Sequence, residues 1–169
     1  MTTNKNILKS IILCLVSAVI MTSCLTTGTS SGGGRSASAD AARRQNIYME
    51  FLRQEGYQPT IDEDGDIAFR REGRTYYIII SKNDPTLIYF TLFGLRTVSS
   101  ESDRVRFANA VGVANRRVKV AKMYLTSGNP QRVNLSIEAF IENPNDFGVL
   151  FNRYLGTMDL SEQRFREAL

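Results

Sequence analysis

The residues of this chain that could do chemistry are mostly carboxylates, because histidine is absent and cysteine is rare. The 169 residues include no histidine and only two cysteines, Cys14 and Cys24. Without histidine there is no Ser-His-Asp or Cys-His nucleophile arrangement and no histidine metal site. Two cysteines, one of them inside an N-terminal apolar run, provide no disulfide framework. Enzymatic options are therefore limited to pairs of carboxylates and to a lysine or tyrosine base.

A cluster of acids, Asp62-Glu63-Asp64-Gly65-Asp66, is the segment to test as a metal site. With Gly65 at the sixth position of a calcium-binding loop, the three aspartates stand at positions three, five and seven. The twelfth position requires a bidentate glutamate, but Arg71 occupies it. We therefore expect a tight turn at Asp64-Gly65 between two extended segments, and neither a metal nor another cofactor.

Glu138 and Glu142, together with Lys122, form the other candidate catalytic group. Paired carboxylates can act as acid and base when their surroundings drive their pKa values apart. Glu138 falls on the polar side of an alternating strand and Glu142 lies beside a helix start, where each has a simpler structural use. We expect no enzymatic activity and assign no catalytic residue. The alternative is an extracytoplasmic small-ligand-binding protein or a carboxylate-based hydrolase.

Residues 1–23 have the layout of a secretory signal peptide. Two lysines precede the unbroken apolar run Ile11–Ile20, which is about half of the roughly 20 residues needed to span a bilayer. The run ends in Met21-Thr22-Ser23-Cys24, which resembles the bacterial lipobox, with methionine where leucine is usual. We expect cleavage before Cys24 and lipid attachment to its thiol. The alternatives are an ordinary secretory signal and a single membrane span.

Residues 24–39 continue as the lipid anchor and a tether rich in glycine and serine. A flexible linker of about 15 residues reaches roughly 20 Å on average, and a protein released after cleavage would not need one here. We therefore expect a domain at residues 40–169 that is held in the cell envelope close to a membrane. Leu25 is not the aspartate that retains lipoproteins in the inner membrane of enteric bacteria, which favours the outer membrane.

The charge of the mature chain argues against nucleic acid as a partner. Removing the signal takes away two of the 21 bases and none of the 17 acids, so a small positive excess of two remains. Three arginine doublets, Arg43-Arg44, Arg70-Arg71 and Arg116-Arg117, are scattered among acids, which predicts solvated surface. Residues 40–169 have the length of one ordinary domain with one core.

Hydrophobic periodicity predicts three helices and five strands in this domain. One helix is expected at 38–56, where Gly56 ends it, and a second from 99 to about 114, with Ser100 as its N-cap. A third is expected after the Asn143-Pro144 cap, with one more short helix in the tail 159–169. The strands are expected at 66–71, 75–81, 86–93, 118–125 and 132–141. The order α-β-β-β-α-β-β-α predicts an α+β fold with an antiparallel sheet of about five strands.

The second and third predicted strands are apolar on both alternations, so both faces of the sheet need cover. One set of residues is our candidate partner-binding surface: Tyr77, Ile79, Ile88, Phe90 and Leu92. The helices of a small domain readily cover one side of a sheet, so a partner, a second copy or the C-terminal segment would cover the other. The alternative is that the domain's own helices and tail hide both faces.

Four segments, by their order and spacing, resemble the YbjN-like family of bacterial proteins. They are Gly56-Tyr57-Gln58-Pro59, Asp64-Gly65-Asp66-Ile67-Ala68-Phe69, Asn115-Arg116-Arg117-Val118-Lys119-Val120-Ala121-Lys122 and Glu138-Ala139-Phe140. The resemblance implies the fold of class I type III secretion chaperones and a protein, often paired, that acts in chaperone-like binding or regulation. Those chaperones are cytoplasmic, whereas this chain carries a lipid signal. We therefore expect a lipid-anchored, non-catalytic protein-binding module whose partners are the membrane, an unidentified protein and, as a homodimer, a second copy.

Overall fold

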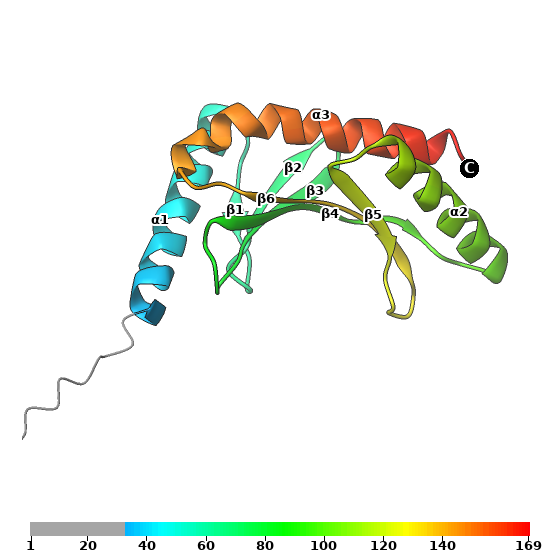
Figure 1. Ribbon diagram of the computed structural model, residues 1–169, viewed down its shortest axis with the longest axis horizontal. Helices are drawn as coiled ribbons and strands as arrows, with labels where there is room; N and C mark the ends of the chain where they lie inside the picture. The colour runs from blue at the N-terminus through cyan, green and yellow to red at the C-terminus, as the bar shows by residue number, and fades with distance from the viewer. Residues whose placement is uncertain (1–32) are drawn as a thin grey trace, which may run out of the picture. The chain divides into compact units, whose positions relative to one another are not determined.

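One antiparallel sheet of six strands carries three α-helices in residues 33–169, the part of the chain that this computed structural model describes (Figure 1). The elements are α1 (Gly33–Gln54), β1 (Thr60–Ile61), β2 (Ile67–Arg71), β3 (Arg74–Ile80), β4 (Leu87–Thr97), α2 (Glu101–Arg117), β5 (Ala121–Leu125), β6 (Arg132–Phe140), the 3₁₀-helix η1 (Pro144–Asp146) and α3 (Phe147–Arg166). The predicted α+β class is confirmed, and β1 is an additional strand. The predicted signal peptide, Cys24 and the start of the tether lie outside the described residues.

The strands lie in the order β1-β2-β3-β4-β6-β5, and every neighbouring pair is antiparallel. These registers put the turns at 62–66 and 81–86 at one end of the strands. The β2–β3 turn, the end of β4 and the β5–β6 hairpin lie at the opposite end. The two ends of the sheet therefore carry different turns with different side chains.

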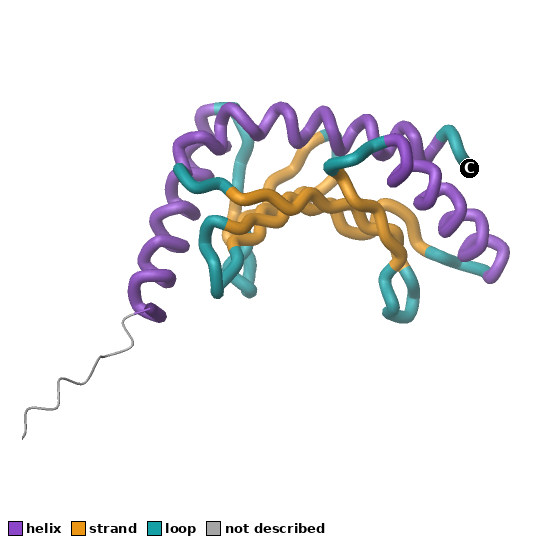
Figure 2. The backbone as a smooth tube through the Cα atoms, in the orientation of Figure 1, coloured by secondary structure: helices purple, strands orange, loops and turns teal. Residues whose placement is uncertain are grey.

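The core lies between the sheet and α3, which runs along one face of the sheet (Figure 2). Phe151 of α3 is fully buried, and its ring lies 5.7 Å from that of Phe69 on β2 and 5.8 Å from that of Phe90 on β4. Burying such a side chain contributes about 1.5–3 kcal/mol. The aromatic contacts from α3 to two strands thus fix the helix on this face.

Helix α1 begins earlier than the sequence predicts and ends where it predicts. Residues 33–37, which we expected to be tether ahead of a helix that begins at 38, are also helical. At the other end, Gly56 has a φ of 86°, its N–H donates to the Arg53 carbonyl (3.0 Å), and the Tyr57 N–H donates to the Leu52 carbonyl (2.9 Å). This pair of bonds is the Schellman motif, which needs a residue with positive φ. The glycine therefore stops the helix.

Arg44 of α1 is buried, although the sequence predicted solvated surface for its doublet. Its guanidinium pairs with Asp40 (2.7 Å) and donates to the backbone carbonyls of Ile141 and Glu142 beyond β6. Burial acts against the charged form, but the hydrogen bond to Asp40 and the nearby Tyr48 hydroxyl raise the Arg44 pKa overall. The side chain joins α1 to a segment nearly 100 residues later, which no local pattern could reveal.

Helix α2 begins where it is expected and buries Phe107, Ala110 and Ala114. Ser100 is the N-cap, and its hydroxyl accepts a hydrogen bond from the Asp103 N–H at 3.0 Å, as the capping pattern predicts. The helix runs to Arg117 and does not turn at Asn115. The Asn115 side chain instead reaches β5, where it donates to the Met123 carbonyl (2.9 Å) and accepts from the Met123 N–H (2.8 Å).

Helix α3 includes the tail, which we expected as a separate short helix. The helix is continuous from Phe147 to Arg166. Met158 and Phe165 are both buried, so the apolar face that begins at Phe147 extends to the end of the helix. No described helix is both long enough and apolar enough to cross a membrane.

Candidate functional site

The face of the sheet opposite α3 is the candidate functional surface, and we call it the open face. The sheet arches with α3 on its outer side, and no helix of the described residues covers the inner side (Figure 1). Strand alternation places the following residues there: Tyr77, Ile79, Tyr89, Thr91, Phe93, Lys122, Tyr124, Asn134, Ser136, Glu138 and Phe140. Aromatic side chains from four strands therefore share one uncovered surface.

Three of these aromatic side chains are well exposed. The exposed fractions are 45% for Phe93, 41% for Tyr124 and 66% for Phe140. The ring of Phe93 lies 5.2 Å from that of half-buried Tyr77. Large apolar side chains that gather on one surface are typical of interaction sites, whereas scattered single ones are not.

A row of polar side chains runs between these aromatic residues. Thr91 donates to the Ser136 hydroxyl at 3.3 Å, and both side chains are buried although no described helix covers them. Asn134 is also buried, because β4 bulges between Leu92 and Arg96 and the Asn134 side chain accepts a bond from the Gly94 N–H at 2.9 Å. From the alternation along β6 we expected Asn134, Ser136 and Glu138 to face solvent, which is wrong for Asn134 and Ser136.

The five residues predicted to form one partner-binding surface do not share a face. Tyr77 and Ile79 lie on the open face, but three others, Ile88, Phe90 and Leu92, are buried in the core. The register pairs Ile79 with Tyr89 and Ile78 with Phe90, which sends the even-numbered residues of both strands inward. Sequence could not fix this register, because both alternations are apolar. The open face instead includes Tyr89, Phe93, Tyr124 and Phe140.

Phe93 lies between two hollows at one end of the open face. One hollow, of about 340 Å³, is lined by the β5–β6 hairpin, Arg132 and Asn134. The other, of about 330 Å³, is lined by Tyr77, Arg74 and Arg96 among others. Both are open and both contain arginine, so this end of the face can receive acidic side chains.

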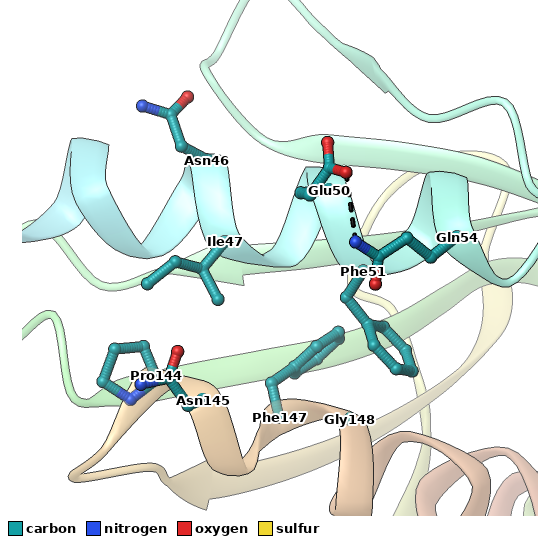
Figure 3. A pocket seen from close by; sticks show the side chains of 9 residues that line it. All are labelled: Asn46, Ile47, Glu50, Phe51, Gln54, Pro144, Asn145, Phe147 and Gly148. Atoms are coloured by element: carbon teal, nitrogen blue, oxygen red, sulfur yellow. Dashed lines mark hydrogen bonds between the residues drawn. The ribbon is translucent and has the colours of Figure 1, made fainter.

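A third hollow, of about 460 Å³, lies between α1 and the η1–α3 segment (Figure 3). Helix α3 approaches α1 so closely that a Cβ built on Gly148 would lie 2.7 Å from the Phe51 ring. The carboxylate among its lining residues, Glu50, accepts a hydrogen bond from Gln54 at 3.1 Å. A single carboxylate held by a neighbouring amide supplies no acid–base pair.

The acidic cluster forms the tight turn that the sequence predicts. The Asp62 carboxylate accepts hydrogen bonds from the N–H groups of Asp64 (3.0 Å) and Asp66 (2.9 Å), and Gly65 has a φ of 89°. Burial, and then the charges of Asp62 and Asp64, raise the pKa of Asp66. In the described residues, no three or more His, Cys, Asp or Glu side chains are grouped to hold a metal ion.

Most of the remaining carboxylates with close partners pair with cations. Glu138 pairs with Lys122 at 3.2 Å, while Glu142 is exposed after β6. On the α3 side, Asp159 accepts two bonds from Arg71 (2.8 and 2.9 Å), and buried Glu162 pairs with Arg74 and with Arg166. The bond to Asp159 raises the Arg71 pKa, so this guanidinium keeps its proton. No sequence pattern predicts this cluster, because the paired residues of β2 or β3 and α3 are 88 positions apart.

Comparisons with known proteins support the fold. No protein-family model and no curated protein matches this chain. The crystal structure of YbjN, described as a candidate transcription regulator from E. coli, matches with a TM-score of 0.55, covering 69% of this chain and 86% of YbjN. The chain is similar to YbjN in fold. The sequence identity is 10%, so the likeness extends to the fold alone.

Proposed function

We propose that this chain is a membrane-anchored bacterial lipoprotein whose domain binds another protein and performs no catalysis. The anchor is a lipid on Cys24, in the lipobox-like sequence that follows the apolar run. Residues after Cys24 hold the domain close to the membrane, with the outer membrane preferred because Leu25 replaces the inner-membrane aspartate. The binding surface is the open face.

The observation that carries the proposal is the set of exposed aromatic side chains on the open face. Phe93, Tyr124 and Phe140 remain between 41% and 66% exposed. Burying the surface of each side chain that is still exposed contributes about 1 kcal/mol of binding free energy. A partner that covers all three therefore gains about 3 kcal/mol before the costs of association. Side chains of this type dominate protein interfaces. Ion-paired carboxylates elsewhere favour a binding role over acid–base chemistry.

The binding surface can be tested by cross-linking the full chain in intact cells and identifying its cross-linked neighbours by mass spectrometry. We expect Phe93→Asp and Tyr124→Asp to reduce the cross-linked species at least tenfold. The matched control is Val149→Asp, which places the same charge at a side chain that is 65% exposed on α3. If all three variants cross-link as the wild type does, the open face is not the binding surface.

The anchor needs a separate test. Mass spectrometry of the mature wild-type chain should find an acylated N-terminal cysteine, and Cys24→Ser should move the protein from the membrane fraction to the soluble fraction. Density-gradient separation of the two membranes then tests the preference for the outer one. An unacylated N-terminus in the native protein would exclude the lipoprotein assignment without affecting the domain's binding role.

A further inference from the structure

We propose that a polar hollow between the β2–β3 hairpin and α3 binds inorganic phosphate. The guanidinium groups of Arg74 and Arg166 hold the anion, and the Glu162 carboxylate accepts a hydrogen bond from its P–O–H group. The hollow lies on the α3 side of the sheet, so the inference goes beyond the proposed function of the open face and does not depend on it.

The hollow has a volume of about 260 Å³ and is lined almost entirely by charged side chains. Three arginines and three carboxylates from β2, β3, the turn between them and α3 surround it, together with Tyr76. Since a water molecule takes up about 30 Å³, the hollow has room for one small tetrahedral anion and several waters.

The Glu162 carboxylate lines this hollow with one oxygen that lacks a hydrogen-bond donor. The residue is only 3% exposed. Its Oε2 accepts a hydrogen bond from Arg74. Its Oε1 lies 2.8 Å from Nη2 of Arg166, but no group in residues 33–169 donates a hydrogen bond to it. Buried polar atoms nearly always have a partner, so this oxygen calls for a ligand that carries an O–H or N–H donor.

The two arginines beside Glu162 carry more positive charge than that one carboxylate balances. Arg71, the third arginine of the hollow, is already held by Asp159 at 2.8 and 2.9 Å and by Glu72 at 3.2 Å. Arg74 and Arg166 share Glu162 as their carboxylate partner in the part of the chain that the structure describes.

A guanidinium has five N–H donors in a planar fork that matches carboxylate and phosphate oxygens. Most of the donors on Arg74 and Arg166 therefore remain available, and the excess charge beside Glu162 attracts an anion. A cationic donor such as an ammonium group is repelled by the same guanidinium groups.

Inorganic phosphate satisfies both requirements, because it is an anion that keeps a P–O–H donor at neutral and mildly alkaline pH. Sulfate is an anion of the same shape without a donor, so it leaves the Glu162 oxygen unsatisfied. A phosphate monoester loses its last proton near pH 6, and above that pH it resembles sulfate. The site should therefore distinguish these three anions by their protons.

Isothermal titration calorimetry of the full chain in a mild detergent tests the site, with sodium phosphate, sodium sulfate and methyl phosphate as probes. At pH 8 phosphate should bind at least about tenfold more tightly than sulfate or methyl phosphate, since a site built for a donor rejects an analogue without one. At pH 5.5 methyl phosphate regains its proton and should bind within about threefold of phosphate, while sulfate stays weak.

Two substitutions separate the roles of charge and donor. Arg166→Gln removes one guanidinium from a side chain that is 56% exposed, so the fold should persist while phosphate affinity falls at least about tenfold. Glu162→Gln supplies an amide N–H in place of the carboxylate, so the preference for phosphate over sulfate should fall below about threefold. Circular dichroism checks that each variant is folded.

The control is Arg153→Gln, which changes an exposed arginine on α3 that has no carboxylate partner in the described residues and should bind phosphate as the wild type does. A wild-type chain that binds no phosphate, or that binds phosphate and sulfate equally, overturns the inference. Unchanged phosphate affinity in folded Arg166→Gln overturns it as well. None of these results bears on the cross-linking test of the open face.

Discussion

Arg44 is a charged residue of a helix surface that the fold nevertheless buries, because it bonds a distant segment of the chain. It is 4% exposed, whereas its neighbour Arg43 is exposed. Sequence treats the two as one doublet, because both are charged and both stand in a helix. Arg44 is buried because the segment just after β6, distant in the chain, provides two backbone carbonyls that accept its hydrogen bonds. Arg43 has no such acceptors in the described residues and stays in solvent.

We predict that Arg44→Ala lowers the free energy of unfolding by about 3 kcal/mol. The change leaves the Asp40 carboxylate without its partner and leaves the backbone carbonyls of Ile141 and Glu142 without their donor. Urea denaturation measures the loss. Arg43→Ala is the matched control and should change stability by no more than about 0.5 kcal/mol; equal losses would show that the Arg44 bonds contribute little.

A second prediction at this scale concerns Asp66, whose pKa in the folded chain is raised above its usual 3.8. The folded state therefore favours the protonated carboxyl, so this group's contribution to stability is greatest below pH 3.8 and is lost as pH rises through the folded pKa. Asp66→Asn should be more stable than the wild type at pH 7 by less than about 1 kcal/mol, because the turn is partly solvated.

Thermal unfolding between pH 3 and pH 7 checks this expectation. The difference between Asp66→Asn and the wild type should shrink toward pH 3. Glu63→Gln is the control at an exposed position of the same turn, and it should give a smaller difference. A stability difference between Asp66→Asn and the wild type that stays constant from pH 3 to pH 7 would contradict the raised pKa of Asp66 as its cause.

At the scale of elements, sequence predicts what local chemistry determines. The Ser100 cap, the Gly56 stop and the Asn143 cap are found where they are expected, since each depends on residues a few positions apart. Strand β1 was missed because two exposed residues carry no periodicity. The sides taken by β3 and β4 were misassigned because register is a property of the pair of strands and not of either strand.

The close contact between α1 and α3 depends on the absence of a side chain at Gly148. Gly148→Ala should lower the free energy of unfolding by about 1–3 kcal/mol, since its Cβ would lie 2.7 Å from the Phe51 ring. Gly156→Ala in the same helix meets nothing within 4 Å and should raise stability by about 0.5–1 kcal/mol. Chemical denaturation compares the two, and a shortened side chain in Phe51→Leu should restore much of the Gly148→Ala loss.

At the scale of the whole molecule, the sequence indicates that one face of the sheet lacks cover but not which residues form it. The excess of apolar residues in β3 and β4 led to that inference, and the described helices do leave one face uncovered. The members of the open face come from β4, β5 and β6 as well as β3, so their meeting follows from sheet order.

The outer edge of β5 is protected from pairing with other chains by the side chain of Asn115. Replacing Asn115 with alanine removes both hydrogen bonds to Met123, which should cost about 1–2 kcal/mol and leave the strand edge unprotected. We expect faster aggregation of Asn115→Ala on mild heating, measured by light scattering. Asn109→Ala, at an exposed position of the same helix with no described side-chain bond, is the control and should aggregate as the wild type does.

The two bonds from Asn115 to Met123 also bear on how copies of the chain can meet. An unprotected strand edge can pair with the edge of another copy, and repetition of that pairing builds a filament. At β5 the Asn115 side chain occupies the backbone groups that such a copy would use, and β1 at the far edge is only two residues long. Both edges of the sheet therefore resist the addition of further strands.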